Sequence, residues 1–332
     1  MKLIKTILIL LIFNVPISFA DSFDEFDEWK FQFKKTALAN DISEKTIDTI
    51  ISNIKFLPKV IGYDRFQPEF YEDTKTYIEK RTSKRKLNKG INFYQNNINL
   101  INDVEKEFDI EKELLLALMG IETNFGSYVG KMDILSSLAT LSFDQRRSEF
   151  FTNELILLLK LIDTNQIDYK TLYGSWAGAF GFFQFMPSTI TNYAIDHNKD
   201  DYINLKDNED AYPSAANYLN KIGWKKNDPC FIKIKLKSDT PKKLLNTSAK
   251  KLHNIKKFKE LKKYISGNQN LLINDDLMAS IITPDKDIIP DAENLNPAYI
   301  VFDNYEKILQ WNRSLRFGLA VCTLMNKFEN AL

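Results

Sequence analysis

Glu111-Lys-Glu-Leu-Leu-Leu-Ala-Leu-Met-Gly-Ile-Glu-Thr-Asn-Phe-Gly126 has the composition of one apolar helix with a carboxylate near its end. Residues 114–119 are apolar on every side, and such a helix is normally buried all round. We expect Asp109 to cap its N-terminus and Gly126 to end it. The helix therefore belongs in the middle of a domain, with other helices packed around it.

Glu122 is the carboxylate near the end of this helix. It follows Leu115, Leu118 and Met119 by seven, four and three residues, so all four side chains share one helical face. Apolar surroundings favour the neutral form of a carboxylic acid. A neutral acid at neutral pH is what the protonation of a glycosidic oxygen requires. The alternative is a structural acid, paired with an Arg or satisfied by backbone amides.

Seven short motifs follow one another along the chain. They are Gly120-Ile-Glu-Thr-Asn-Phe-Gly126, Leu138-Ala-Thr-Leu-Ser-Phe143, Arg146-Arg147, Gly174-Ser-Trp-Ala-Gly178, Gln184-Phe-Met-Pro-Ser188, Ala216-Asn-Tyr-Leu219 and Asn312-Arg-Ser314. In this order they resemble the motifs of the membrane-bound lytic transglycosylase B family, bacterial peptidoglycan-cleaving enzymes with a goose-lysozyme-like core. The resemblance makes Glu122 the expected catalytic residue.

The fold class that follows is mainly α, of the α+β type. We expect a lysozyme-like helical catalytic core, an additional helical domain and a small β-containing insert. The expected divisions are 1–20 as a signal peptide, 21–108 as an N-terminal helical domain, 109–224 as the core, 225–296 as a lysine-rich insert and 297–332 as a C-terminal helical segment packing back on the helical domain and cleft. Residues 231–237, Phe-Ile-Lys-Ile-Lys-Leu-Lys, alternate and predict a strand with lysines toward solvent.

Residues 1–20 have the pattern of a cleaved secretory signal. Lys2 and Lys5 precede an apolar run, and Ser18-Phe19-Ala20 supplies small residues at the expected cleavage site. The run is short for a membrane span, and no Cys lies nearby to accept a lipid. We expect an exported, periplasmic monomer with no membrane span after cleavage; the alternative is an uncleaved N-terminal anchor.

Charge and cysteine content narrow the class of protein further. The chain has 45 Lys and Arg against 44 Asp and Glu, and this balance gives no reason to expect a nucleic-acid partner. Cys230 and Cys322 are the two cysteines. An exported location permits a disulfide between them, but the sequence does not show whether their Cα atoms come within reach.

The glycine-rich stretch 174–188 has the composition of a sugar-binding wall. Its glycines allow backbone to approach a ligand, and its aromatic residues supply flat apolar faces; tight helix packing is the alternative. By the resemblance, Ser175 and Gln184 contact the substrate. The family usually has small or polar residues just before this Gln, whereas Phe182 and Phe183 stand here.

Three further residues are placed at the substrate cleft by the resemblance: Tyr77, Tyr218 and Asn312. A packing role is the alternative for Tyr77, and a helix-entry role is the alternative for Asn312. For Arg146 and Arg147 we expect a structural role, each holding a nearby acid such as Asp144 or Glu149, because Arg does not shuttle protons.

An acidic loop after residue 195 has a spacing typical of calcium ligands. Oxygen ligands stand at alternate positions, Asp196, Asn198 and Asp200, followed by the carbonyl of Tyr202, and the resemblance adds Asp210. Asp201 replaces the usual turn glycine. A structural calcium site and a solvated acidic loop both remain open.

The expected reaction, implied by the resemblance, is cleavage of the β-1,4 bond between N-acetylmuramic acid and N-acetylglucosamine with closure of a 1,6-anhydro ring on the muramyl end. Glu122 acts as acid and then as base, and catalysis requires no cofactor. The partners are peptidoglycan glycan strands. Two alternatives stay open: a lysozyme-type muramidase, in which water replaces the C6 hydroxyl, and a non-catalytic peptidoglycan-binding protein.

Overall fold

The computed structural model describes residues 19–66, 72–267, 272–286 and 295–332. The expected signal segment therefore lies almost entirely outside the described residues. Over the described ranges, no helix combines the length and the apolar character that crossing a membrane requires.

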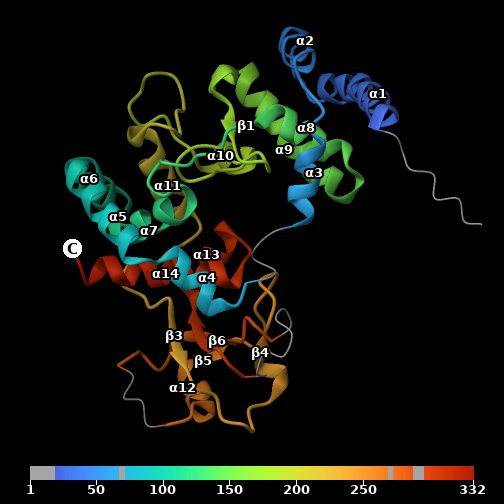
Figure 1. The fold of residues 1–332 in the computed structure, drawn as a ribbon. Coiled ribbons are helices and arrows are strands. Elements are labelled where there is room, and N and C mark those ends of the chain that lie inside the picture. Colours follow the sequence, from blue (N-terminus) through green and yellow to red (C-terminus); the bar gives the residue numbers. More distant parts are fainter. Residues whose placement is uncertain (1–18, 67–71, 268–271, 287–294) are drawn as a thin grey trace, which may run out of the picture.

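Helices make up most of the described chain, as Figure 1 shows. The α-helices are α1 (Phe19–Leu38), α2 (Glu44–Ile51), α3 (Pro58–Arg65), α4 (Thr74–Arg81), α5 (Lys84–Asn96), α6 (Ile98–Phe108), α7 (Lys112–Thr123), α8 (Ile134–Phe143), α9 (Ser148–Asp163), α10 (Pro187–Tyr193), α11 (Asn208–Lys221), α12 (Phe258–Leu261), α13 (Asp303–Trp311) and α14 (Leu315–Glu329).

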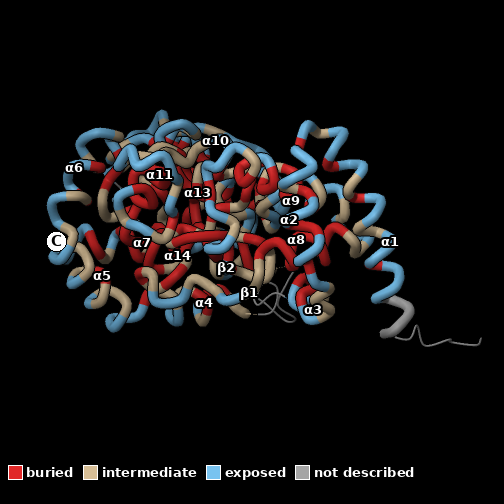
Figure 2. Tube along the Cα trace, turned by 90° about the horizontal axis from the view of Figure 1, so that it is seen from above, coloured by how far each residue is buried: buried red, intermediate tan, exposed pale blue. Residues whose placement is uncertain are grey.

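Helix α7 is the central helix, as its sequence predicts. Each of residues 114–119 is 0% exposed, and α14, α5, α6 and α11 pack around the helix. Figure 2 shows the buried segments running through α7 and α14. A side chain here has no route to water, so the composition of residues 114–119 is what this position in the fold requires.

The two ends of α7 differ from the expectation. Asp109 does not cap α7; it ends α6 in the left-handed conformation, with φ of 54°, which Asp tolerates better than most residues. Glu111 stands at the N-cap position instead, and its buried carboxylate accepts hydrogen bonds from Trp224 Nε1 and the Asn227 amide, both at 2.7 Å. At the other end Asn124, two residues before Gly126, is the C-cap.

A second group of helices lies beside the first. Helices α8 and α9 form an extensively packed pair, with α3 against α8 and α2 against α9. The carboxylate of Glu154 on α9 is buried and accepts hydrogen bonds from the Ser188 amide (2.8 Å) and hydroxyl (2.7 Å). These bonds fix the start of α10 on α9.

The β-structure forms two sheets. Strands β1 (Met132–Asp133) and β2 (Tyr173–Gly174) pair antiparallel. The larger sheet contains β3 (Phe231–Ile234), β4 (Leu245–Asn246), β5 (Lys256–Lys257), β6 (Met278–Ile282) and β7 (Ala298–Phe302). Its order is β3-β7-β6-β4 with β5 also on β6, and the β4–β6 pair is parallel. The predicted strand at 231–237 is confirmed over its first four residues.

The larger sheet belongs to two cores at once. Alternate side chains of β7 face opposite sides of the sheet. Ile300 and Phe302 pack with α12 in a small separate core, whereas Tyr299 and Val301 join the main helical core. In Figure 1 helices α13 and α14 lie between this sheet and the helices above. The central strand β7 comes from residues beyond 296, so the β-structure extends past the expected insert.

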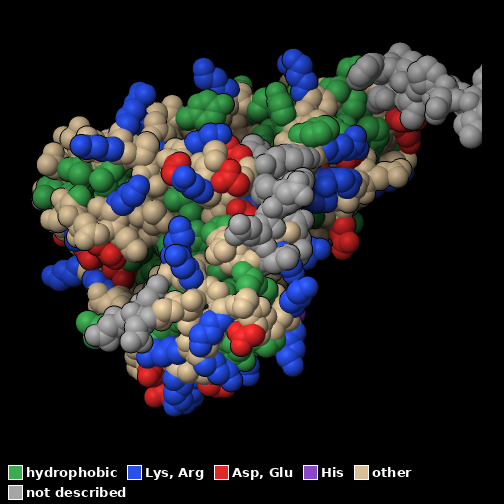
Figure 3. Space-filling view, turned by 60° about the horizontal axis from the view of Figure 1, so that its bottom comes forward, with side chains coloured by type: hydrophobic (Ala, Val, Ile, Leu, Met, Phe, Trp, Pro, Cys, Tyr) green, Lys and Arg blue, Asp and Glu red, His purple; other side chains and the backbone are tan. Residues whose placement is uncertain are grey.

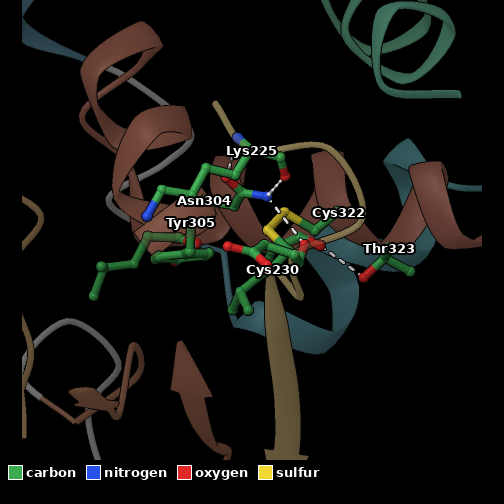
Figure 4. Close-up of a disulfide and its surroundings, with 9 residues drawn as sticks. Lys225, Cys230, Asn304, Tyr305, Cys322 and Thr323 are labelled. Atoms are coloured by element: carbon green, nitrogen blue, oxygen red, sulfur yellow. Dashed lines mark hydrogen bonds between the residues drawn. A yellow bond between two sulfur atoms is a disulfide. The ribbon is translucent and has the colours of Figure 1, made fainter. Parts of the chain in front are cut away.

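One covalent link and one polar link fix the sheet to α14. Cys230, just before β3, forms a disulfide with Cys322 of α14, as Figure 4 shows, with Cα atoms 6.2 Å apart. Asp285, after β6, accepts hydrogen bonds from the Thr74 amide (3.1 Å) and from Arg316 of α14 (2.7 Å). Both partners of the Asp285–Arg316 pair are buried, so the attachment resists opening.

Candidate active site

A cleft of about 1290 Å³ opens beside the C-terminal end of α7. Six parts of the chain line it: Tyr63 and Phe66 at the end of α3, Glu122 in the last turn of α7, Arg147, residues between 175 and 186, residues 247–250 of the insert, and residues 311–316 from the end of α13 to the start of α14. Among the described residues that line this cleft, Glu122 is the one carboxylate. A general acid in this cleft therefore has one candidate in the described chain.

Glu122 is held from across the cleft by the last residue of α13. Trp311 Nε1 donates a hydrogen bond of 3.1 Å to Glu122 Oε1. The indole itself is fixed by stacking on Tyr218, with ring centroids 4.9 Å apart and planes 22° apart, and by the edge of Phe185 at 5.3 Å. A stacked indole has little freedom, so it holds the carboxyl in one orientation.

Two lysines of α5 hold the C-terminal end of α7. Lys86 Nζ donates to the Gly120 carbonyl at 2.6 Å, and Lys89 Nζ donates to the Asn124 carbonyl at 2.7 Å. Cations at the carbonyl end of a helix complete its unsatisfied acceptors and complement its dipole. Burial lowers the pKa of Lys86 to about 8. The site therefore keeps a partly desolvated cation close behind Glu122.

Ser175 and Gln184 line the cleft, and their side chains also shape its wall. Ser175 Oγ accepts from the Ala179 amide at 2.9 Å. Gln184 Nε2 donates to the Gly181 carbonyl at 2.8 Å, and its backbone is left-handed, with φ of 52°. Non-glycine residues in this conformation are uncommon and often mark functional turns. Both residues thus belong to the wall of the cleft that contains Glu122.

Phe182 and Phe183, which depart from the family's pattern, have structural partners. The Phe182 carbonyl accepts a hydrogen bond of 2.8 Å from Thr123 Oγ1, which ties the wall to the end of α7. Phe183 is buried with its ring against Tyr212 (5.2 Å) and Trp311 (6.2 Å). Neither phenylalanine is among the described residues that line the cleft.

The three other expected cleft residues have different positions. Asn312 lines the cleft directly. Tyr218 lies behind Trp311; burial raises its pKa to about 12, so its hydroxyl stays protonated and donates to the Gln310 carbonyl at 3.1 Å. Tyr77 is 1% exposed beneath Arg81, 3.4 Å from ring centroid to guanidinium carbon, and is not among the described residues that line the cleft.

Arg146 and Arg147 each hold an acid, as expected, but with another partner, and Arg147 also lines the cleft. Both bind the buried carboxylate of Asp64 on α3, Arg146 Nε at 2.8 Å. Asp144, one of the two expected partners, pairs instead with Arg65 at 2.9 Å. The expectation of a local acid was wrong because the packing of α3 on α8 brings a more buried acid to the arginines.

The acidic loop folds around its own amides. Asp196 accepts from the Asp200 and Asp201 amides at 3.2 and 2.9 Å, and buried Asp210 accepts from the Asn204 amide at 2.8 Å. Asp201 has φ of 74°, the conformation for which a calcium loop normally uses glycine. In the described chain, no three acidic, His or Cys side chains come together as a metal-holding group. The oxygen donors suit calcium chemically, although their present arrangement does not form a cage.

The sequence did not predict four parts of the cleft lining: Trp311, residues 247–250, Arg147, and Tyr63 with Phe66 at the end of α3. Trp311 directly precedes Asn312 in a matched motif, and a tryptophan at a motif boundary was a signal that we did not interpret. Residues 247–250 come from the insert, where the resemblance lapses. No local pattern indicates that this loop reaches the cleft, because its position depends on the pairing of β4 with β6.

Comparison with known proteins places the chain in a family. The model of the transglycosylase SLT domain matches residues 25–326, and the chain belongs to this family.

The sequence is 39% identical over 153 residues to the membrane-bound lytic murein transglycosylase B of Escherichia coli, a match that covers 46% of this chain and 42% of that relative. The match thus spans less than half of the relative's length.

Solved structures resemble the whole described fold. SltB3 from Pseudomonas aeruginosa, in complex with NAG-NAM-pentapeptide, has a TM-score of 0.80 and 28% identity, covering 92% of this chain and 79% of that one. The Escherichia coli lytic transglycosylase Slt35, in complex with calcium, has a TM-score of 0.75 and 26% identity, covering 91% and 93%. The expected fold class, a mainly helical protein with a lysozyme-like core, is confirmed.

Proposed function

We propose that this protein is a peptidoglycan lytic transglycosylase that cleaves the β-1,4 bond between N-acetylmuramic acid and N-acetylglucosamine. The observation that carries the proposal is Glu122 in the cleft, held by the Trp311 indole at 3.1 Å. Family membership supports it, and so do the names of the relatives, which are lytic transglycosylases.

The chemistry needs one acid. Protonated Glu122 gives its proton to the glycosidic oxygen as the bond to muramyl C1 breaks, and N-acetylglucosamine leaves as the alcohol. The Glu122 carboxylate then takes the proton of the muramyl C6 hydroxyl, whose oxygen bonds to C1 and closes the 1,6-anhydro ring. The acid is restored and no water is consumed. The Trp311 hydrogen bond stabilises the carboxylate formed between the two proton transfers.

The sugar contacts are part of the same proposal. Ser175, Gln184 and Asn312 line the cleft and offer polar groups to a sugar, while Trp311 offers an apolar face. Tyr218 acts indirectly, by supporting Trp311. We do not extend the proposal to Tyr77, since its ring is buried under Arg81.

The acidic loop is proposed as a structural calcium site, separate from catalysis. The supporting observations are the oxygen donors of Asp196, Asn198 and Asp200, the left-handed turn at Asp201, and the calcium complex of Slt35. Binding would require the carboxylates to exchange amide partners for the ion. The expected export to the periplasm stays a prediction.

Replacing the catalytic acid tests the proposed function. Glu122→Gln keeps the shape of the side chain but removes the proton, so release of soluble muropeptides from purified sacculi should fall by roughly 10²- to 10⁴-fold or more. Glu111→Gln makes the same change at the other end of α7, outside the cleft, and should keep turnover. Activity of the Glu122 variant within a few-fold of the parent would mean that another carboxylate is the acid, with Asp133 and Asp144 the next to test.

A further inference from the structure

A second cavity, of about 320 Å³, adjoins the cleft on the side of the insert. The two hollows share the lining residues Ala249, Lys250 and Arg313, so they form one continuous depression. The floor of the second cavity continues the aromatic stack behind Trp311, with Tyr218 on Tyr193 at a centroid distance of 4.3 Å. A polymer bound beside Glu122 would therefore bring any branch on this side into the second cavity.

The loop that forms the outer wall of this cavity, residues 247–252, has a fixed position. The buried side chain of Asn246 bridges its two ends, because it accepts from the His253 amide at 2.7 Å and donates to the Ile281 carbonyl of β6 at 2.9 Å. Leu252 is 5% exposed and belongs to the main core, although the loop comes from the insert. The loop is thus tied to the sheet at its two ends and packs on the helical body through Leu252.

Three cations surround the cavity. Lys250, Lys251 and Arg313 are exposed, and among the described residues none of them forms an ion pair. Glu306 is the acid that lines the same cavity, which leaves an excess of two positive charges. Figure 3 shows Lys and Arg side chains spread over the lower lobe of the molecule.

We propose that this cavity binds the carboxylate-bearing peptide that branches from the substrate's muramyl sugars. The inference rests on the proposed function, because peptidoglycan is a glycan that carries short peptides with free carboxylates. A fixed rim of unpaired cations attracts such groups with little loss of side-chain or loop entropy on binding. The peptide in the SltB3 complex shows that a related protein accepts a peptide-bearing sugar. Peptide binding here makes the enzyme prefer peptide-bearing strands to bare glycan.

The test compares the double variant Lys250→Gln/Lys251→Gln with the parent on two substrates: glycan strands with their peptides, and the same strands stripped by an amidase. The readout is the ratio of kcat/KM on the two. Two rim charges should change this ratio by about three- to tenfold toward bare glycan. The matched control, Lys233→Gln/Lys235→Gln, removes two exposed lysines of the same insert and should leave the ratio unchanged.

An unchanged ratio in the Lys250/Lys251 variant, or an equal loss on both substrates, overturns the proposal. A calorimetric titration with the isolated peptide that branches from the muramyl sugar tests the binding site without relying on turnover. Weaker binding to the double variant than to the parent supports the proposed site, and equal binding refutes it. A parent protein that binds the peptide but cleaves neither strand would refute the proposed function and leave the peptide site standing.

Discussion

Replacing Trp311 with phenylalanine separates the two things that this residue does. The phenylalanine ring still packs on Tyr218 and Phe185, but the hydrogen bond from Nε1 to Glu122, 3.1 Å long, is lost. That bond favours the ionised carboxylate. Its removal should keep the acid protonated to higher pH, so the alkaline limb of the pH–rate profile should move upward.

The size of the loss in rate follows from the strength of the bond. A hydrogen bond to a charged group contributes roughly 1.5–3 kcal/mol, and about 1.4 kcal/mol corresponds to a tenfold change in rate. Glu122 and Trp311 are both half-buried, so the lower end of the range applies. We expect kcat/KM at its pH optimum to fall by roughly tenfold, because the carboxylate intermediate loses a donor.

The assay is the pH dependence of kcat/KM on soluble glycan strands for Trp311→Phe and for a matched control. Trp224→Phe removes the equivalent indole–carboxylate bond, Trp224 Nε1 to Glu111 at 2.7 Å, at the opposite end of α7 and outside the cleft. The control should lower the unfolding midpoint without moving the profile. An alkaline limb that stays in place or moves to lower pH in Trp311→Phe would show that the indole does not stabilise the acting carboxylate.

Three other predictions concern stability. Burial lowers the pKa of Lys86 from its ordinary 10.5 to about 8. Between these two pH values the unfolded chain binds the proton more strongly than the folded protein does, so the parent should gain stability relative to Lys86→Met as pH rises from 8 to 10.5. A stability difference between the two proteins that does not change with pH contradicts this. The Cys230–Cys322 disulfide closes a loop with a sequence separation of 92. Its removal by a double Ala substitution should lower the free energy of unfolding by roughly 4–5 kcal/mol in denaturant titrations. A loss under about 1 kcal/mol would refute this prediction. If the loop at Asp196 binds calcium, a chelator should lower the melting temperature, and identical melting curves in chelator and millimolar calcium would remove that site.

Sequence reasoning succeeded where one stretch of chain determines its own environment. The composition of residues 114–119 requires burial on all sides, and the helix is buried on all sides. Alternation in residues 231–237 predicted a strand, and β3 forms there. The family resemblance, and not a local pattern, indicated Ser175, Gln184 and Asn312; they line one cleft with Glu122, and their contact with substrate stays a prediction.

Sequence reasoning failed where a contact depends on packing between distant elements. Arg146 and Arg147 bind Asp64, more than 80 residues away, in preference to neighbouring acids. Asp109 has the right chemistry for a helix N-cap, but it lies at the C-cap of α6, in the tight turn before α7, and has the left-handed conformation. The partner of Glu122, Trp311, is 189 residues away. The arginine pairing and the position of Asp109 have no local signal, because each depends on which helices lie side by side; Trp311 had one, its place beside the Asn312 motif.

The central claim is that the muramyl C6 hydroxyl, and not water, attacks C1. Mass spectrometry of the muropeptides that the parent protein releases from purified sacculi tests this directly. The account predicts muramyl ends that lack one water, the mass of the 1,6-anhydro ring, with these products absent from a Glu122→Gln digest. Fully hydrated reducing ends in the parent digest would contradict it and show that the protein is a hydrolase of the lysozyme type.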